Sequence, residues 1–163
     1  MTGTLAVWSF TTETGTQTQT AASMTATGVT AGAVSRSTGL VATSGMGSIN
    51  SSMWSLSATN DGTTYYTFSV TPPAGCMMDL TQLAVATKAS STGPHSAAVG
   101  TSADAFAATT AAAATTTATV TDAALSVSGA TGMIELRVFG WAATATGGTF
   151  RIQDTLTLTG TLR

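Results

Sequence analysis

Charged residues are scarce in this sequence, which has five Lys and Arg and seven Asp and Glu among 163 residues. Five cations spread along the whole chain do not form the basic patch that contacts a phosphate backbone, so nucleic acid is excluded as a partner. The low charge does not indicate disorder, because 43% of the residues are hydrophobic and the mean hydropathy is +0.30. We expect the chain to fold as one domain over residues 1–163.

Cysteine and histidine each occur once, as Cys76 and His95. One cysteine forms no internal disulfide, and one Cys with one His does not complete a structural zinc site. We expect Cys76 to be a small buried apolar residue and His95 to lie in a loop.

Long hydrophobic runs are also absent. No apolar segment approaches the ~18 residues of a membrane-spanning helix, so no membrane span is expected. The N-terminus has neither the basic nor the apolar region of a signal peptide. Sparse charge with abundant Thr and Ser is nevertheless typical of an extracellular or cell-surface protein. Two explanations of how the protein leaves the cell stay open. Either an export signal was removed, or the protein is released in another way, for example as part of a virion.

Small residues dominate what is present. The sequence holds 37 Thr, 29 Ala, 17 Ser and 17 Gly, so the core must be built from few large side chains. Thr is β-branched and suits the pleated surface of a sheet, and the chain has no long charged amphipathic stretch. This composition favours sheets over a helical bundle.

Two segments near the C-terminus alternate with the period of a strand. In 150–161, the even-numbered apolar residues lie on one face and a row of Thr on the other. In 133–141, Ile134, Leu136 and Val138 share one face. Gly147–Gly148 lies between the two segments and supplies the flexible backbone of a hairpin. We expect these two strands to pair antiparallel.

Further segments have strand composition and are separated by turn residues. They are 5–10, 25–34, 52–56, 65–70, 80–87, 96–101 and 115–120. Short strands in this number predict an all-β fold, an antiparallel β-sandwich with the jelly-roll architecture of lectins. The Ala-rich segment 103–114 predicts one helical turn near Asp104–Ala108, followed by irregular chain.

Several stretches follow one another in the order found in a known family. They are LAVWSF (5–10), ATGVTAG (26–32), YYTFSVTP (65–72), MDLTQL (78–83), STGP (91–94), SADAFA (102–107) and FGWAATATGGTFRI (139–152). Together they resemble the secreted β-sandwich domains of bacterial surface proteins and PEP-CTERM-type exported proteins. The resemblance covers nearly the whole chain and implies a lectin-like sandwich with no established activity. The chain departs from the family in having no visible export signal and Gln153–Asp154 in its last strand.

Catalytic groups are poorly represented. A nucleophilic triad needs a base, and His95 is the sole candidate, while no Gly-x-Ser-x-Gly motif singles out a serine. The carboxylates do not cluster, so paired-carboxylate glycosidase chemistry has no support either. The sequence therefore predicts a protein that is not an enzyme.

Asp154 falls on the apolar face of the last strand, where an unpaired charge is costly. Three explanations are open: a bulge that turns the side chain outward, pairing with an Arg or with backbone donors, or ligation of calcium. Asp154 is thus the one candidate metal ligand, and no other cofactor is expected.

Aromatic residues are few, and a core of small residues needs most of them. If exposed, however, Trp and Tyr rings have the shape to stack on sugars. Phe139 and Trp141 are predicted to share a strand face with Glu135 and Arg137, under a loop, at a groove or at a subunit contact. The candidate residues for ligand binding or an interface are Trp141, Phe139, Trp54 and Tyr65.

These patterns favour a non-enzymatic recognition module, carbohydrate-binding or adhesive, whose partner is a glycan or another surface ligand. The alternative is a structural subunit that assembles with copies of itself, as in a virion decoration protein, a capsid-associated protein or an appendage filament.

Overall fold

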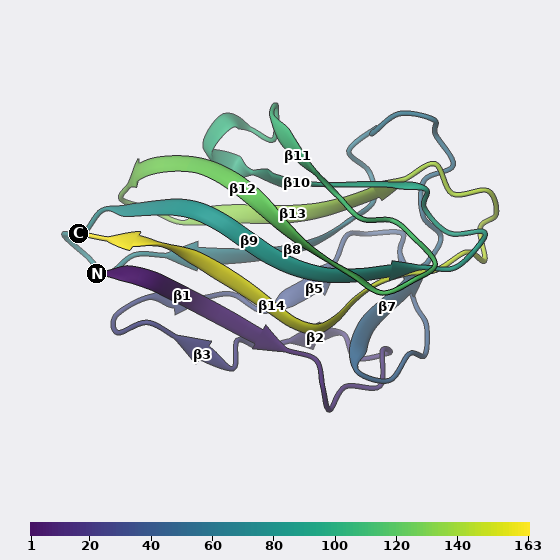
Figure 1. Cartoon of the computed structure of the whole chain (residues 1–163), viewed down its shortest axis with the longest axis horizontal. Helices are drawn as coiled ribbons and strands as arrows, with labels where there is room; N and C mark the ends of the chain where they lie inside the picture. The colour runs from purple at the N-terminus through teal and green to yellow at the C-terminus, as the bar shows by residue number, and fades with distance from the viewer.

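Two antiparallel β-sheets face each other in the computed structural model, which describes all 163 residues (Figure 1). The first sheet runs in the order β12-β9-β14-β1-β3, with β7 and β6 continuing from β14. The second runs in the order β11-β10-β13-β8-β5-β2, with β4 paired to β8. The predicted antiparallel β-sandwich is confirmed.

The strands of the first sheet are β1 (Thr2–Ser9), β3 (Met24–Thr25), β6 (Val41–Ala42), β7 (Ser48–Ser52), β9 (Met78–Ala89), β12 (Thr119–Ala130) and β14 (Phe150–Leu162). The strands of the second sheet are β2 (Gln19–Thr20), β4 (Thr30–Ala31), β5 (Val34–Arg36), β8 (Tyr65–Thr71), β10 (Ser96–Thr101), β11 (Thr109–Ala112) and β13 (Ile134–Trp141). One short 3₁₀ helix, η1 (Ser102–Asp104), follows β10. None of the helical structure has the length and hydropathy needed to cross a bilayer.

A single core cluster fills the space between the sheets. Strand alternation builds it: in β8, Tyr66, Phe68 and Val70 point inward and are buried, whereas the intervening residues are half-buried. Trp8 contributes the largest side chain of β1, packs edge-on against Phe68 with ring centroids 4.9 Å apart, and donates from its indole nitrogen to the Gly32 carbonyl. The large residues predicted for the core therefore do most of the packing between layers of small ones.

Trp54 belongs to this core and not to the surface, which corrects its place among the candidate ligand-binding residues. It is 2% exposed and packs edge-on against Tyr66 and Phe150. Its indole nitrogen donates to the Ser51 carbonyl at 2.8 Å. Gly140 makes room for the ring, because a Cβ there would lie 2.9 Å from the Trp54 Cε3 atom. With its nitrogen paired and its ring enclosed, Trp54 has no face left for a ligand.

The predicted hairpin between the last two strands is wrong. β13 pairs with β8 and β10 in the second sheet, while β14 pairs with β1, β9 and β7 in the first. The connection through Gly147–Gly148 crosses from one sheet to the other (Figure 1). β13 and β14 each bury the apolar face that their alternation indicates. These faces belong to different sheets and contact each other across the core, so the strands are not neighbours in one sheet. Alternation identifies the buried face of a strand and not its neighbour.

Other expectations for the strands also need correction. The strand predicted over 52–56 lies at Ser48–Ser52, because Met53 has a φ of 66° and turns the chain inward. The strand predicted over 115–120 begins only at Thr119, since the hydroxyls of Thr115 and Thr119 both bond to the Thr117 carbonyl and hold a loop.

The Ala-rich segment differs from its prediction as well. Its helical turn is a 3₁₀ turn at Ser102–Asp104, earlier than expected, and the chain after it is not irregular but forms β11. β11 pairs with β10, and this ladder outweighs the helix propensity of Ala. Cys76 is half-buried in the loop before β9 and not fully buried, because its backbone N–H closes a turn onto the Pro73 carbonyl.

The bulge explanation for Asp154 agrees with the structure. The register between β14 and β9 shifts between Gln153 and Leu156, and Asp154 has a φ of 58°. Its carboxylate is exposed and accepts a hydrogen bond from the Gln153 side chain at 3.0 Å. No group of three His, Cys, Asp or Glu side chains stands close enough together to hold a metal ion. Calcium ligation at Asp154 stays a prediction.

Both ends of the chain lie side by side. β1 and β14 pair along their length from Thr2 opposite Thr161, and the terminal amine of Met1 donates to the Leu162 carbonyl. Figure 1 shows the two termini at one end of the sandwich, with the tip of β13 at the other.

Candidate functional site

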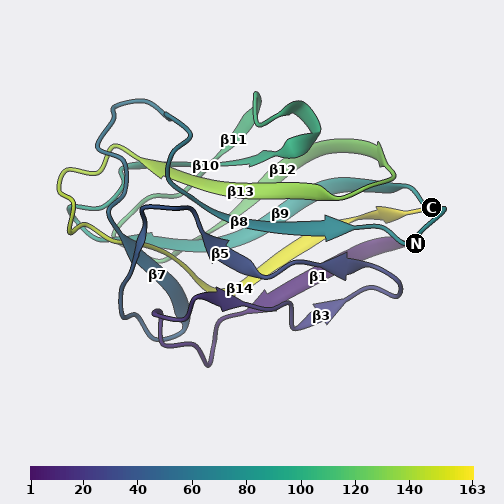
Figure 2. The ribbon, with the colours of Figure 1, turned by 180° about the vertical axis from the view of Figure 1, so that it is seen from behind.

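The outer face of the second sheet, whose strands lie in front in Figure 2, carries a cluster of aromatic side chains. In β13, Ile134, Leu136 and Val138 point into the core, so Arg137 and Trp141 point outward. The prediction that Glu135, Arg137, Phe139 and Trp141 lie on one face of this strand is thus confirmed. We call the cluster the aromatic face; it consists of Tyr65, Phe106, Arg137, Phe139 and Trp141.

Phe139 forms the floor of the aromatic face. It lies opposite Tyr65 in the ladder between β13 and β8, and the two rings meet edge-on with centroids 5.5 Å apart. Phe106 closes over it from the other side at 6.0 Å. Phe139 is consequently only 3% exposed. Its part in the site is to support Tyr65 and Phe106, and it does not meet a ligand itself.

Arg137 lies between two rings. Its guanidinium carbon is 4.1 Å from the centroid of Tyr65 and 4.1 Å from that of Phe106, a double cation–π arrangement. Nε donates to Glu135 Oε1 at 2.7 Å, but neither terminal nitrogen of the guanidinium donates to any protein atom. The side chain is 24% exposed, so these N–H groups are held in a fixed plane and remain open to solvent.

Glu135 completes the polar part of this surface. Burial raises the pKa of its carboxyl, but hydrogen bonds from Arg137 and from the Thr67 hydroxyl, with the charge of Arg137, outweigh burial and lower the pKa below its ordinary value. Oε1 accepts both bonds, and Oε2 accepts none. A free acceptor therefore stands beside the free donors of Arg137.

The lowered pKa of Glu135 predicts an acid-dependent contribution to stability. A carboxyl whose folded pKa lies below its unfolded value of about 4.3 stabilises the fold above that pH, and the contribution is lost as the pH falls through the folded pKa. We expect Glu135→Gln to lower the urea midpoint at neutral pH, and the difference from the parent protein to shrink as the pH falls below about 4. Urea unfolding across this range tests it, and a difference that stays constant with pH would contradict it.

Phe106 reaches the aromatic face through an unusual turn. Ala105 and Phe106 both have left-handed backbone conformations, with φ of 57° and 63°. The Asp104 carboxylate holds the turn by accepting the Ala108 N–H at 2.9 Å. Gly100 lies opposite Arg137 in the ladder, and a Cβ there would lie 3.3 Å from the Phe139 ring and in ordinary contact with the Phe106 ring. The turn thus folds Phe106 back over Arg137.

Two shallow grooves flank the aromatic face. One, of about 350 Å³, has Trp141 and His95 on one side and the β10–β11 hairpin on the other. The second, of about 240 Å³, is lined by Glu135, Thr67, Ser35 and Met133. Both grooves combine apolar side chains with a few polar groups, as binding sites for small polar ligands do.

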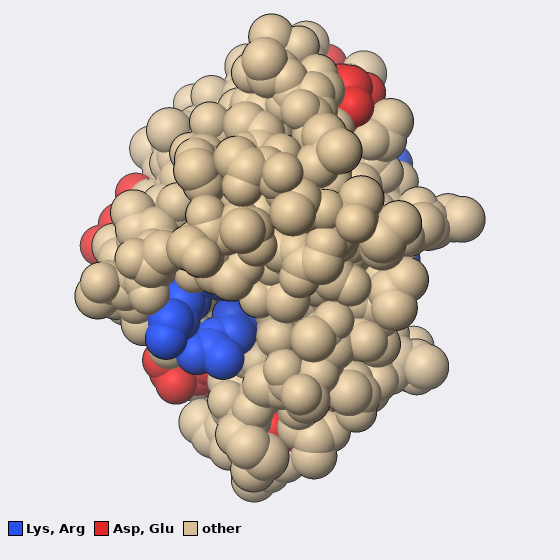
Figure 3. Space-filling view, turned by 90° about the vertical axis from the view of Figure 1, so that its right-hand side faces the viewer, with Lys and Arg blue, Asp and Glu red and all other residues tan.

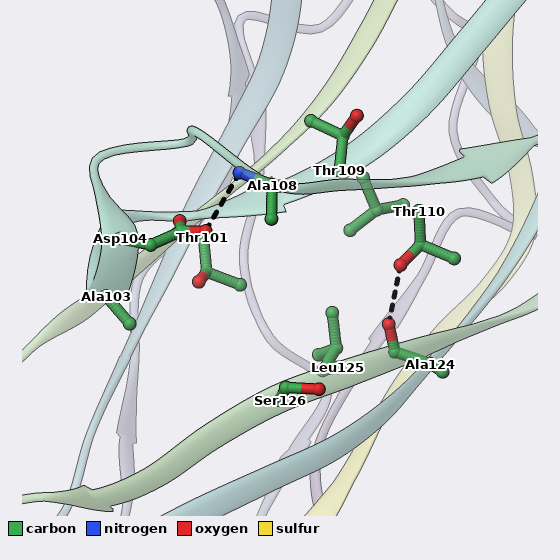
Figure 4. A pocket seen from close by; sticks show the side chains of 11 residues that line it. Thr101, Ala103, Asp104, Ala108, Thr109, Thr110, Ala124, Leu125 and Ser126 are labelled. Carbon is green, nitrogen blue, oxygen red and sulfur yellow. Dashed lines mark hydrogen bonds between the residues drawn. The ribbon is translucent and has the colours of Figure 1, made fainter.

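A third hollow, of about 190 Å³, opens at the edge of the sandwich between β11 and β12 (Figure 4). It contains no aromatic side chain. Two of its polar groups are already engaged: Thr110 donates to the Ala124 carbonyl at 2.8 Å, and Asp104 accepts from Ala108. This hollow offers less for a ligand to bind than the aromatic face does.

The sequence-predicted candidates are therefore divided. Tyr65 and Trp141 are half-buried on the aromatic face, and Phe139 is beneath it. Trp54 is in the core. Sequence reasoning missed Phe106, because nothing in an Ala-rich segment signals two consecutive left-handed residues.

Comparisons with protein-family models and with curated proteins match nothing. Among solved structures, the N-terminal cellulose-binding domain of β-1,4-glucanase C from Cellulomonas fimi is similar over 82% of this chain and 89% of that one, with 16% identity and a TM-score of 0.44. A family two carbohydrate esterase from Cellvibrio japonicus is similar over 82% of this chain, with 13% identity and a TM-score of 0.35. The match covers 35% of the esterase chain.

Proposed function

We propose that this protein is a non-catalytic module that binds carbohydrate outside the cell through its aromatic face. The observation that carries the proposal is the placement of Arg137. Its free donors lie between two aromatic rings and beside the free acceptor of Glu135. A sugar ring has an apolar face of C–H groups and a rim of hydroxyls. The apolar face suits Tyr65 and Trp141, and neighbouring hydroxyls suit a donor and an acceptor side by side.

The surroundings of His95 support a binding function over a catalytic one. Its ring Nε2 contacts the Ser91 carbonyl at 3.2 Å, and it has no hydrogen bond to a serine hydroxyl or a carboxylate. A base without a nucleophile or an orienting acid does not form a triad. His95 therefore gives no support to triad-based chemistry, and carbohydrate is proposed as a ligand.

A direct test is a binding screen of the whole chain. Affinity electrophoresis in gels containing soluble glucans, xylans, mannans and galactans, together with sedimentation on insoluble cellulose, covers the neutral polysaccharides. We expect at least one of them to be bound, and Trp141→Ala to weaken that binding about tenfold, because the ring is an open contact at the groove. Its melting temperature is expected to change little, since Trp141 is half-buried at the tip of β13.

Binding that is unchanged in Trp141→Ala would move the site away from the aromatic face. Absence of binding across the panel would contradict carbohydrate recognition altogether. Light scattering of the same samples addresses the alternative of a structural subunit. A binding module stays monomeric as concentration rises, whereas a subunit that assembles with its own copies forms a large species.

A further inference from the structure

The five basic side chains fall into two groups. Arg163 forms an ion pair with Asp79, Arg137 pairs with Glu135, and Arg36 is enclosed by the backbone carbonyls of three loop and strand residues. Lys88 and Arg151 have no carboxylate partner. Among the five cations, these two have neither a carboxylate partner nor the surrounding backbone carbonyls that Arg36 has.

Lys88 and Arg151 are also placed directly opposite each other. They form a register pair between β9 and β14, on the outer face of the first sheet, and both are half-buried. Like charges opposite each other in a ladder destabilise a sheet, so their juxtaposition is not explained by the stability of the fold. Figure 3 views the molecule from the end where β9 stops and β14 starts, and it shows basic side chains side by side with acidic atoms next to them, on a surface that is otherwise mostly uncharged. No carboxylate lies within ion-pair distance of Lys88 or Arg151.

A small hollow of about 100 Å³ lies between them, lined by Lys88, Ala89, Ser90, Thr149 and Arg151. Every polar side chain around it has a donor to spare. Arg151 Nε donates to Gln153, but its terminal nitrogens and the Lys88 ammonium donate to no protein atom. The Ser90 hydroxyl oxygen accepts from the Thr149 backbone N–H, so its proton remains available.

From this arrangement we infer an anion site that takes an oxyanion group such as sulfate. Two cations without counter-charges and two hydroxyl donors converge on a space the size of one small group. A tetrahedral oxyanion presents several acceptors to such donors at once, and the planar fork of Arg151 suits two of them. The site lies on the sheet opposite the aromatic face and does not depend on carbohydrate binding there.

The test is a titration of the ¹⁵N-labelled protein with sodium sulfate, with sodium chloride keeping the ionic strength constant. NMR is preferred to thermal unfolding because sulfate stabilises most proteins through exclusion from their surface. We expect saturable shifts confined to the amides of 88–90 and 149–151. Lys88→Gln and Arg151→Gln should each weaken the affinity about tenfold, and the double variant should abolish the saturable shifts.

Arg163→Gln is the matched control, since it removes an exposed cation that already has a partner, and it should leave the sulfate affinity unchanged. The double variant is expected to fold, because it removes a like-charge contact, and the single variants test the site in any case. Trp141→Ala should retain the sulfate shifts, which separates this site from the aromatic face.

The source of the oxyanion is distinguished by repeating the titration with dextran sulfate and with dextran. If the group is carried on a polymer, the half-saturating concentration, counted as sulfate groups, should be about tenfold lower for dextran sulfate than for sodium sulfate. If dextran sulfate is no better than inorganic sulfate, the site takes a free anion. Shifts that are not saturable, that spread over the chain, or that persist in the double variant would overturn the inference.

Discussion

Arg137→Ala is expected to eliminate measurable carbohydrate binding, the largest functional loss from any single substitution on the aromatic face. Removing the guanidinium takes away the free donors and also the group that separates Tyr65 from Phe106, with 4.1 Å to each ring. Truncating an arginine that anchors a binding surface costs about 2 kcal/mol or more, which is at least about thirtyfold in affinity. Isothermal titration with the polysaccharide found in the screen measures it.

Arg137→Lys is the informative companion to this variant. It keeps the positive charge beside Glu135 but loses the planar fork that stacks between the rings. We expect it to fold like the parent protein and to bind nearly as poorly as the alanine variant. Arg163→Ala removes an arginine from an exposed ion pair and should bind like the parent. If Arg137→Lys kept full affinity, charge alone would be the determinant and the stacked geometry would be irrelevant.

Trp54→Ala is expected to produce the largest loss of stability among the aromatic residues discussed. The ring is enclosed by Tyr66 and Phe150, and its nitrogen is bonded to the Ser51 carbonyl. Truncation of a buried Trp costs about 3 to 5 kcal/mol in the free energy of unfolding, a large share of the roughly 5 to 15 kcal/mol of a typical domain. Urea unfolding followed by circular dichroism gives the value directly.

Two further substitutions sharpen this result. Trp141→Ala removes the same side chain from the half-buried tip of β13, and we expect it to cost about 1 kcal/mol or less. Gly140→Ala places a methyl group against Trp54 and should destabilise the parent by about 1 to 3 kcal/mol. In the Trp54→Ala background that cost should shrink, because the two closest contacts are with Trp54 and only the contact of 3.3 Å with Phe150 remains. A loss below about 1 kcal/mol in Trp54→Ala would show that the ring is not part of the core.

The fold class could be predicted because it depends on composition and alternation. The strands predicted at 65–70, 80–87, 96–101, 133–141 and 150–161 coincide with β8, β9, β10, β13 and β14 to within a few residues at each end. In most of them larger apolar residues alternate with small or polar ones, and burial of one face follows from that period. β10 is the exception, because its small residues do not alternate and five of its six residues are buried.

Pairing and placement in space depend on long-range contacts that no local pattern reports. The turn at Gly147–Gly148 suits a hairpin as well as it suits a crossing between sheets, and the long-range ladders of β14 with β1, β7 and β9 favour the second. In the candidate site, too, one part follows from local pattern and another depends on contacts that the pattern does not report. The shared face of Arg137 and Trp141 follows from alternation, but Phe106 joins it through a turn that depends on Asp104.

The adjacent ends of the chain have a practical consequence for how the protein can be displayed. Because Met1 and Arg163 emerge together, a tether at either one leaves from the same pole, and Trp141 at the tip of β13 is directed away from it. A surface coated through either terminus would hold the Trp141 end of the proposed site outward in both cases, with the rest of the aromatic face along the side of the molecule. A short linker joining the two ends would also permit circular permutants that open the chain in an exposed loop without disturbing the sheets.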